Sequence, residues 1–243
     1  MKHLISLTKV ELLTLKRESI YFLLSIGMPS AFYILFSGLI PQGDNGAAAT
    51  IYLFSMTIFS IMSTAFFSIP SDLYSNKVNN WQKLLYHSPV SVVEYYISKF
   101  LIALISFTIS IIGVFSVGHF VRNVNLPLLD WIVVACIILV GSIVFIAMGV
   151  MLTLLPSIQL MSVIGNIVYM FVAVVGGLWF PLSMMPNWLQ SVGKTLPSYH
   201  LVRVVSVYLE HHTLSISSIL VILAYTVVVF SLTILLKKRI EVK

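Results

Sequence analysis

The sequence predicts an all-α polytopic membrane protein, and three observations carry this prediction. Hydrophobic residues make up 59% of the 243 positions and charged residues only 9%, whereas soluble domains carry about 25% charged residues. Residues 131–193 contain no Asp, Glu, Lys, Arg or His, and a charge at the centre of a bilayer costs roughly 2.5–3.5 kcal/mol. The apolar residues also gather into six long segments. We therefore expect a single transmembrane domain that covers residues 1–243.

The six segments have the length that membrane-spanning helices need. Each holds about 20 residues or more, and a helix rises 1.5 Å per residue, so each can cross roughly 30 Å of hydrocarbon. Of the nine prolines, only Pro29 falls inside a segment, and the others lie at segment ends or in connections, where a missing N–H is tolerated. The predicted spans are about residues 21–40, 50–70, 97–120, 131–154, 159–180 and 216–236.

The first 20 residues are predicted to form a helix that lies on the membrane surface. An apolar stripe of this helix would face the lipid tails, and its basic residues would face lipid phosphates. The charges also interrupt any signal-peptide core, so we expect no cleavable leader. The stripe consists of Ile5, Thr8, Leu12 and Leu15, and the basic residues are Lys9, Lys16 and Arg17.

The distribution of Lys and Arg predicts on which side of the membrane the termini lie. An even number of spans puts both termini on the same side. With the termini inside, 11 of the 14 Lys and Arg residues lie on the inner side, in agreement with the positive-inside rule. We expect a multi-pass protein of the cell (inner or cytoplasmic) membrane with both termini in the cytoplasm. The same distribution accounts for the net charge of +6 without a nucleic-acid partner.

Two connections are long and differ in character. The inner connection, residues 71–98, is polar and compatible with a short helix, and it carries Trp81 and the pair Leu84–Leu85. The outer connection, residues 181–215, is mostly apolar, and its aromatic residues suit a membrane interface. The connection between spans four and five is only a few residues long, so these two spans are expected to form a tight hairpin.

Motifs for catalysis or nucleotide binding are missing from this sequence. Gly193, Lys194 and Thr195 resemble the end of a P-loop, but the first glycine of that motif is replaced by Trp188, so we expect no ATP site. Neither H-E-x-x-H nor paired intramembrane aspartates occur. A dyad of His119 and Ser142 is disfavoured because no other residue of the pattern calls for a nucleophile. We therefore predict no catalytic residues in this chain.

Metal binding and ion-coupled transport also find little support. Three histidines share the outer connection with Glu210, but neighbouring histidines on a helix point about 100° apart, so a solvated surface is the favoured interpretation. All eight acidic residues lie in connections, tails or segment edges, whereas ion-coupled transporters usually carry such groups at membrane depth. We predict no metal site. The histidines are His200, His211 and His212.

Two stretches of sequence carry a resemblance to a known family. The inner stretch reads Asn-Asn-Trp-Gln-Lys-Leu-Leu-Tyr-His-Ser-Pro-Val-Ser over residues 79–91. The outer stretch reads Gly-Gly-Leu-Trp-Phe-Pro-Leu-Ser-Met-Met-Pro-Asn-Trp-Leu over residues 176–189 and continues as Leu-Pro-Ser-Tyr-His from residue 196. Together with the length and the number of segments, these stretches resemble the permease of type-2 ABC exporters. The acidic and glycine residues usual before the inner helix are replaced by 77–80, Lys-Val-Asn-Asn.

The resemblance implies a division of labour between subunits. A separate P-loop ATPase subunit would bind ATP and Mg²⁺, and this chain would need no cofactor of its own. The inner connection resembles a coupling helix that docks on that subunit, through Lys77, Trp81, Lys83, Leu84, Leu85, Ser88 and Pro89. The outer stretch resembles a re-entrant hairpin, with Gly176, Gly177, Phe180, Pro181, Pro186, Trp188, Pro197 and Tyr199. Six spans form half of a pathway, so a second permease, identical or paralogous, is expected.

The expected function is therefore the membrane-spanning permease of an ATP-driven exporter. Spans two and five would line a cleft whose apolar, aromatic and methionine side chains suit a drug, a lipid or a hydrophobic peptide. The same side chains also fit plain helix packing. Two other functions stay open: a non-transporting immunity or sensor protein, and an ion-coupled secondary transporter. The candidate lining residues are Phe59, Met62, Phe66, Asn166, Tyr169 and Met170.

Overall fold

The computed structural model describes residues 7–9, 11–13, 19–38, 46–79 and 91–241, and the regular structure in them is helical throughout. The prediction of an all-α polytopic membrane protein is confirmed. Among the described residues, five helical stretches are long and apolar enough to cross a membrane: Ala47–Val78, Val93–Arg122, Leu128–Leu152, Ile158–Val175 and Ile216–Arg239. A sixth apolar helix over Leu23–Ser37 is shorter, so the number of six spans stays a prediction.

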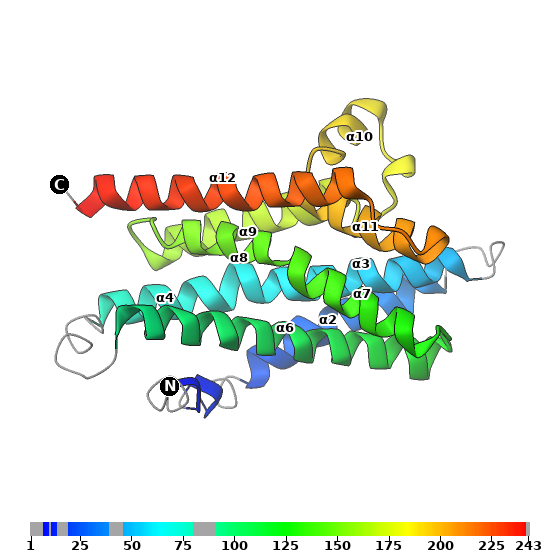
Figure 1. Cartoon of the computed structure of the whole chain (residues 1–243), viewed down its shortest axis with the longest axis horizontal. Coiled ribbons are helices and arrows are strands. Elements are labelled where there is room, and N and C mark those ends of the chain that lie inside the picture. The colour runs from blue at the N-terminus through cyan, green and yellow to red at the C-terminus, as the bar shows by residue number, and fades with distance from the viewer. Residues whose placement is uncertain (1–6, 10, 14–18, 39–45, 80–90, 242–243) are drawn as a thin grey trace.

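The helices follow one another in an up-and-down arrangement (Figure 1). Their bounds are α2 Ser19–Ser37, α3 Ala47–Ser63, η2 Thr64–Ser68, α4 Ile69–Val78, α6 Val92–Arg122, α7 Leu128–Gly141, α8 Ile143–Leu152, α9 Ile158–Val175, η3 Leu182–Met184, α10 Asn187–Gly193, α11 Pro197–His211 and α12 Ile216–Glu241. Figure 1 shows α10 standing off the side of the bundle near one end.

The second predicted span differs most from its expected limits. Instead of ending at residue 70, the helix continues to Val78 through a π-helical turn, η2, between α3 and α4. Pro70 lies in the first turn of α4, where it cannot donate to the helix ladder. The π-helical turn directly before it changes the hydrogen-bond register, which lets the helix pass the proline without ending.

The third span begins at a recognisable capping motif, and the fifth span ends at one. α6 starts five residues before the predicted limit, because Ser91 and Glu94 form a reciprocal capping box: the Ser91 hydroxyl accepts from the Glu94 amide, and the Glu94 carboxylate accepts from the Ser91 amide. α9 ends earlier than predicted at a Schellman motif. In it, Gly177 has φ +82° and the Leu178 amide donates to the Ala173 carbonyl, 2.9 Å away.

The bundle has two chemically distinct ends. At one of them, which we call the terminal end, Lys99 pairs with Glu11 from the first part of the chain, and the Lys237 ammonium near the end of α12 lies 6.0 Å from the Tyr96 ring centroid. The described beginning and end of the chain therefore lie at the same end. The opposite end carries α10 and α11, and we call it the α11 end (Figure 1).

α3 forms the centre of the bundle. Every residue from Tyr52 to Met62 is buried, as expected for a helix that is apolar on all sides and surrounded by other helices. α12 is instead mostly exposed, because only 11% of its most apolar 18-residue stretch is buried against the rest of the protein. Most of α12 therefore faces lipid or another subunit.

Candidate functional site

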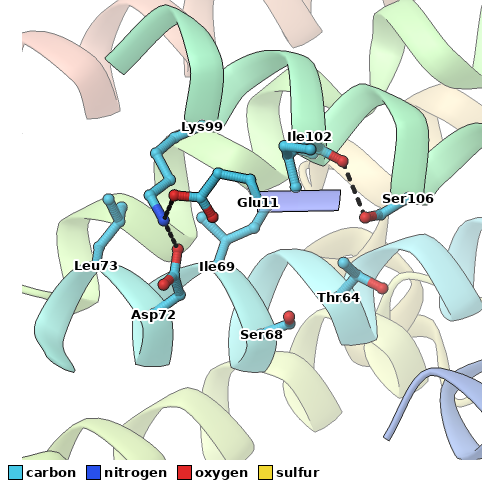
Figure 2. A pocket seen from close by; sticks show the side chains of 10 residues that line it. Glu11, Thr64, Ser68, Ile69, Asp72, Leu73, Lys99, Ile102 and Ser106 are labelled. Carbon is cyan, nitrogen blue, oxygen red and sulfur yellow. Dashed lines mark hydrogen bonds and ion pairs between the residues drawn. The ribbon is translucent and has the colours of Figure 1, made fainter. Parts of the chain in front are cut away.

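An ion cluster at the terminal end joins three separate parts of the chain. The Lys99 ammonium lies 2.6 Å from a Glu11 carboxylate oxygen and also pairs with Asp72 (Figure 2). Lys99 comes from the start of α6, Asp72 from α4 and Glu11 from the helical residues 11–13. The lysine side chain is only 9% exposed, so the two carboxylates compensate a cation that has lost most of its water.

Hydrogen bonds extend this cluster along α4. The Asn76 amide donates to the Asp72 carboxylate over 3.1 Å and to the Tyr95 hydroxyl over 3.0 Å. The Tyr74 hydroxyl donates to the Pro156 carbonyl over 2.9 Å, in the connection between α8 and α9. α4 is thereby tied to α6 on one side and to the α8–α9 hairpin on the other.

The π-helical turn η2 lies directly before this cluster and packs against α8. A methyl group added at Gly149 of α8 would lie 1.9 Å from the Ala65 carbonyl oxygen, so the two helices approach more closely than any larger residue allows. π-helical turns recur at functional sites because they change the direction of side chains along a helix. Here the turn precedes Asp72, the residue that reaches Lys99.

The described residues on both sides of the predicted coupling segment lie at the terminal end. Lys77, its first residue, is exposed in the last turn of α4. The flanking helices α4 and α6 are the two that the ion cluster joins. The other predicted coupling residues lie outside the described residues: Trp81, Lys83, Leu84, Leu85, Ser88 and Pro89.

The predicted hairpin residues divide into a packed base and an exposed tip. At the base, the Ser198 hydroxyl donates to the Val172 carbonyl over 2.8 Å. A methyl group at Gly176 would lie 1.9 Å from that hydroxyl oxygen. Pro197 is buried at the start of α11, while Gly177 and Tyr199 are half-buried. The other four predicted residues are exposed at the tip: Phe180, Pro181, Pro186 and Trp188.

α11 returns alongside the helical stretch Leu128–Leu152 instead of standing free. A methyl group at Gly141, near the middle of the stretch Leu128–Leu152, would lie 2.3 Å from the Leu201 side chain. In the last turn of α11 the Tyr208 hydroxyl donates to the buried Asp130 carboxylate over 3.1 Å. α11 thus runs from the middle of that helix to its beginning, a path compatible with a re-entrant segment. Its depth in the bilayer stays a prediction.

Four of the six candidate lining residues lie in the core of the chain. Phe59, Met62 and Phe66 are at most 2% exposed, and Tyr169 is 6% exposed. The rings of Phe59 and Tyr169 stack with centroids 4.9 Å apart. In this conformation these four side chains fill the space between α9 and the continuous helix of α3 and η2, as in the packing alternative, and do not face an open cleft.

The two remaining candidates lie on the more accessible side of α9. Asn166 is exposed and Met170 is half-exposed. An apolar stripe of Val163, Ile167 and Phe171 runs beside them, each 46–64% exposed. A cleft-lining role therefore stays a prediction, and it fits this face of α9 better than the face that packs on α3.

Comparison with known proteins settles the family. The family model described as "ABC-2 type transporter" matches residues 2–210. The chain belongs to this family. It is also 29% identical over 186 residues to a Bacillus subtilis (strain 168) protein named "Putative transport permease YvfS", and this covers 76% of each chain. The chain is thus the membrane permease component of an ABC transporter, whose ATP-binding subunit is a separate partner.

Sequence reasoning missed the ion cluster of this ABC-2 permease. Asp72 was expected to lie in a solvated connection, because the preceding span was expected to end at residue 70. Lys99 lies inside the predicted third segment, and a charge inside an apolar segment usually has a partner. That signal was available in the sequence, although it does not identify Glu11 and Asp72 as the partners.

Proposed function

We propose that this chain is the permease of an ATP-driven exporter that moves an amphiphilic or lipophilic substrate, such as a drug, a lipid or a hydrophobic peptide, out of the cell. Two permeases, identical or paralogous, would work with two ATPase subunits that bind ATP and Mg²⁺. The coupling segment from Lys77 to Pro89 would dock on the ATPase at the cytoplasmic side. The observation that carries this proposal is the ion cluster that joins both helices flanking that segment.

The ion cluster connects the helices that flank the proposed docking segment, so a movement of that segment can be passed on to the membrane part of the protein. A displacement of the segment would pull on α4 and α6 together, because two interactions join these helices. Lys99 of α6 forms an ion pair with Asp72 of α4. Asn76 of α4 donates a hydrogen bond to Tyr95 of α6. α4 continues without a break through η2 into α3, the buried centre of the bundle. Movement at the surface would therefore reach the core of the permease.

The exposed apolar surfaces favour a lipophilic substrate and a second permease. The stripe of Val163, Ile167 and Phe171 on α9 offers neither charge nor metal ligand to a polar solute. Placed across a twofold axis from its copy, such a stripe would form one wall of a pathway between two permeases. It would also suit close contact with apolar cargo.

A coupling test compares Trp81, in the proposed coupling segment, with Trp188 at the α11 end. Trp81→Ala and Leu85→Ala should reduce co-purification of the ATPase subunit at least about tenfold, since apolar anchors dominate such interfaces. They should also abolish transport-coupled ATP hydrolysis in proteoliposomes. Trp188→Ala is the matched control, because Trp188 is 69% exposed at the α11 end, and it should leave ATPase binding unchanged. Unaltered ATPase binding in both Trp81→Ala and Leu85→Ala would contradict the coupling assignment.

A further inference from the structure

α9 carries three exposed polar side chains along one line of its outward surface. Gln159, Ser162 and Asn166 follow one another at spacings of three and four residues, so they lie on the same side of the helix. All three are exposed, although α9 is apolar enough to cross a membrane. The exposed apolar side chains of Val163 and Ile167 adjoin this line. Contact with lipid accounts for the two apolar residues but not for the polar line.

The three polar residues differ in the partners that they need. The Ser162 hydroxyl donates to the Ile158 carbonyl of its own helix over 2.9 Å, so it is satisfied within α9. Gln159 is the second residue of α9, near one end of the spanning stretch, where water and lipid headgroups can pair with its amide. The Asn166 amide makes no hydrogen bond to the part of the chain that the structure describes. Asn166 is therefore the residue whose partner has to come from outside the chain.

Asn166 lies at the middle of the spanning helix, where no solvent replaces a missing partner. α9 runs from Ile158 to Val175, so about 12–14 Å of helix separates Asn166 from either end. The core of a bilayer contains neither water nor lipid headgroups, and a polar group without a hydrogen bond is strongly unfavourable there. Polar side chains at this depth usually face another helix and bond to it.

A second asparagine amide satisfies the first one. The side chain carries a carbonyl acceptor and an NH₂ donor, so two copies related by a twofold axis can donate to each other reciprocally. A single buried asparagine can also fix the register of two packed helices. Ser162, one turn before Asn166, is small and has a satisfied hydroxyl, so it lets a second helix come close. The hydrogen-bonding groups on this face are therefore complementary to those of an identical face.

We propose that Asn166 forms a reciprocal hydrogen-bonded pair with Asn166 of the partner subunit, a second and identical copy of this chain. The two α9 helices cross at this point. The inference rests on the proposed function, which needs two permeases, and it adds that the two are identical and where they meet. Phe171, five residues further on and about 140° around the helix, faces away from the contact.

Disulfide crosslinking in native membranes tests where the two copies meet. Cys136 is the single cysteine of the chain and is exposed, so Cys136→Ser first removes background crosslinking. In that background, Asn166→Cys should crosslink two copies on mild oxidation, because a disulfide forms where two Cβ atoms lie within about 4.5 Å. Phe171→Cys is the matched control, since Phe171 is a 46% exposed residue of the same helix, and it should give no crosslinked dimer.

A second measurement separates the hydrogen bond from mere proximity. Energy transfer between differently labelled copies in lipid vesicles gives the fraction of dimer as the protein is diluted into lipid. Asn166→Leu keeps the size of the side chain but removes the amide, and it should weaken association about five- to thirtyfold, the range for hydrogen bonds between membrane helices. Asn166→Gln retains an amide and should keep most of the association. Gln159→Leu is the control and should change association by less than about twofold, as expected at a solvated position.

Two results would overturn the inference and leave the proposed function intact. The first is a protein that still co-purifies with its ATPase subunit but crosslinks no better through Asn166→Cys than through Phe171→Cys. The second is equal association of Asn166→Leu and the unaltered protein, which would mean that Asn166 faces cargo or a paralogous permease. Failure of the unaltered protein to bind any ATPase subunit would instead overturn the proposed function.

Discussion

The two ends of this permease are held together by different interactions. At the terminal end, side chains meet through charge and hydrogen bonds: Lys99 pairs with Glu11 and Asp72, and Asn76 bridges Asp72 to Tyr95. At the α11 end, backbones meet closely where glycines leave no room for a side chain, as at Gly176 against α11 and Gly193 against the end of α9.

The difference concerns how each end can move. An ion pair can lengthen or exchange partners while its charges stay compensated, whereas a close backbone contact is lost as soon as the helices shift. The terminal end is therefore suited to receive a displacement from a partner subunit, and the α11 end is suited to keep its shape. Three substitutions, ordered by their expected effect, test this contrast.

Lys99→Met should have the largest effect. It leaves the Glu11 and Asp72 carboxylates facing each other without the cation between them. Breaking a buried pair costs roughly 3–5 kcal/mol, and because Asp72 is 39% exposed we expect a loss of about 2–3 kcal/mol. The measurement is the unfolding midpoint in mixed detergent micelles. Adding Asp72→Asn to Lys99→Met should restore part of the loss.

Lys77→Met is the matched control for Lys99→Met, since Lys77 is an exposed lysine on α4. Surface substitutions of this kind usually change stability by no more than about 0.5 kcal/mol. Equal losses in the two variants would show that the ion cluster contributes nothing beyond an ordinary surface charge.

Gly176→Ala should come second, with a loss of about 2 kcal/mol from overpacking. The added methyl group would lie 1.9 Å from the Ser198 hydroxyl oxygen and 2.4 Å from the Val172 carbonyl oxygen, so the base of the α11 end must open. Gly27→Ala is the control, because no atom lies within 4 Å of a methyl group there. The contrast between the ends fails if both alanines are tolerated alike.

Tyr208→Phe should have the smallest effect, about 1 kcal/mol, because it removes one hydrogen bond to the buried Asp130. His212 stays 3.7 Å from that carboxylate and limits the loss. Tyr225→Phe on α12 serves as the control, since the Tyr225 hydroxyl makes no hydrogen bond to the described residues. A loss above about 3 kcal/mol would mean that the α11 end depends on charge as much as the terminal end does.

Hydropathy predicted the helical fold of the chain because lipid imposes the same apolar composition on every spanning helix. Because that composition is the same on all sides of a helix, hydropathy did not distinguish buried residues from lipid-facing ones. Phe59 and Met62 are buried, while Ile167 and Phe171 are exposed, yet all four are apolar residues in apolar segments. In a membrane, periodicity does not distinguish a side chain that meets another helix from one that meets lipid.

The features that the sequence did not predict depend on contacts between distant segments. The π-helical turn η2 packs against α8 around Gly149, which lies about 80 residues further along the chain. Lys99 and Asp72 are 27 residues apart, on different helices. The start of α6 is different, because the pattern Ser91-x-x-Glu94 is a readable capping box. Attention to that pattern would have placed Tyr95, which lies before the predicted start at residue 97, on the helix as well.

The close contact between Ala65 and Gly149 divides the helix of 47–78 into two unequal arms. At 1.5 Å per residue, the arm toward Ala47 measures about 27 Å and the arm toward Val78 about 20 Å. A rigid rod that turns about this contact therefore works as a lever with a gain of roughly 1.4, so that a push of about 3 Å at Val78 swings Ala47 by about 4 Å in the opposite direction. Spin labels on both arms, compared with and without nucleotide on the partner subunit, would measure this gain. Equal displacements in the same direction would mean that the helix slides instead of pivoting.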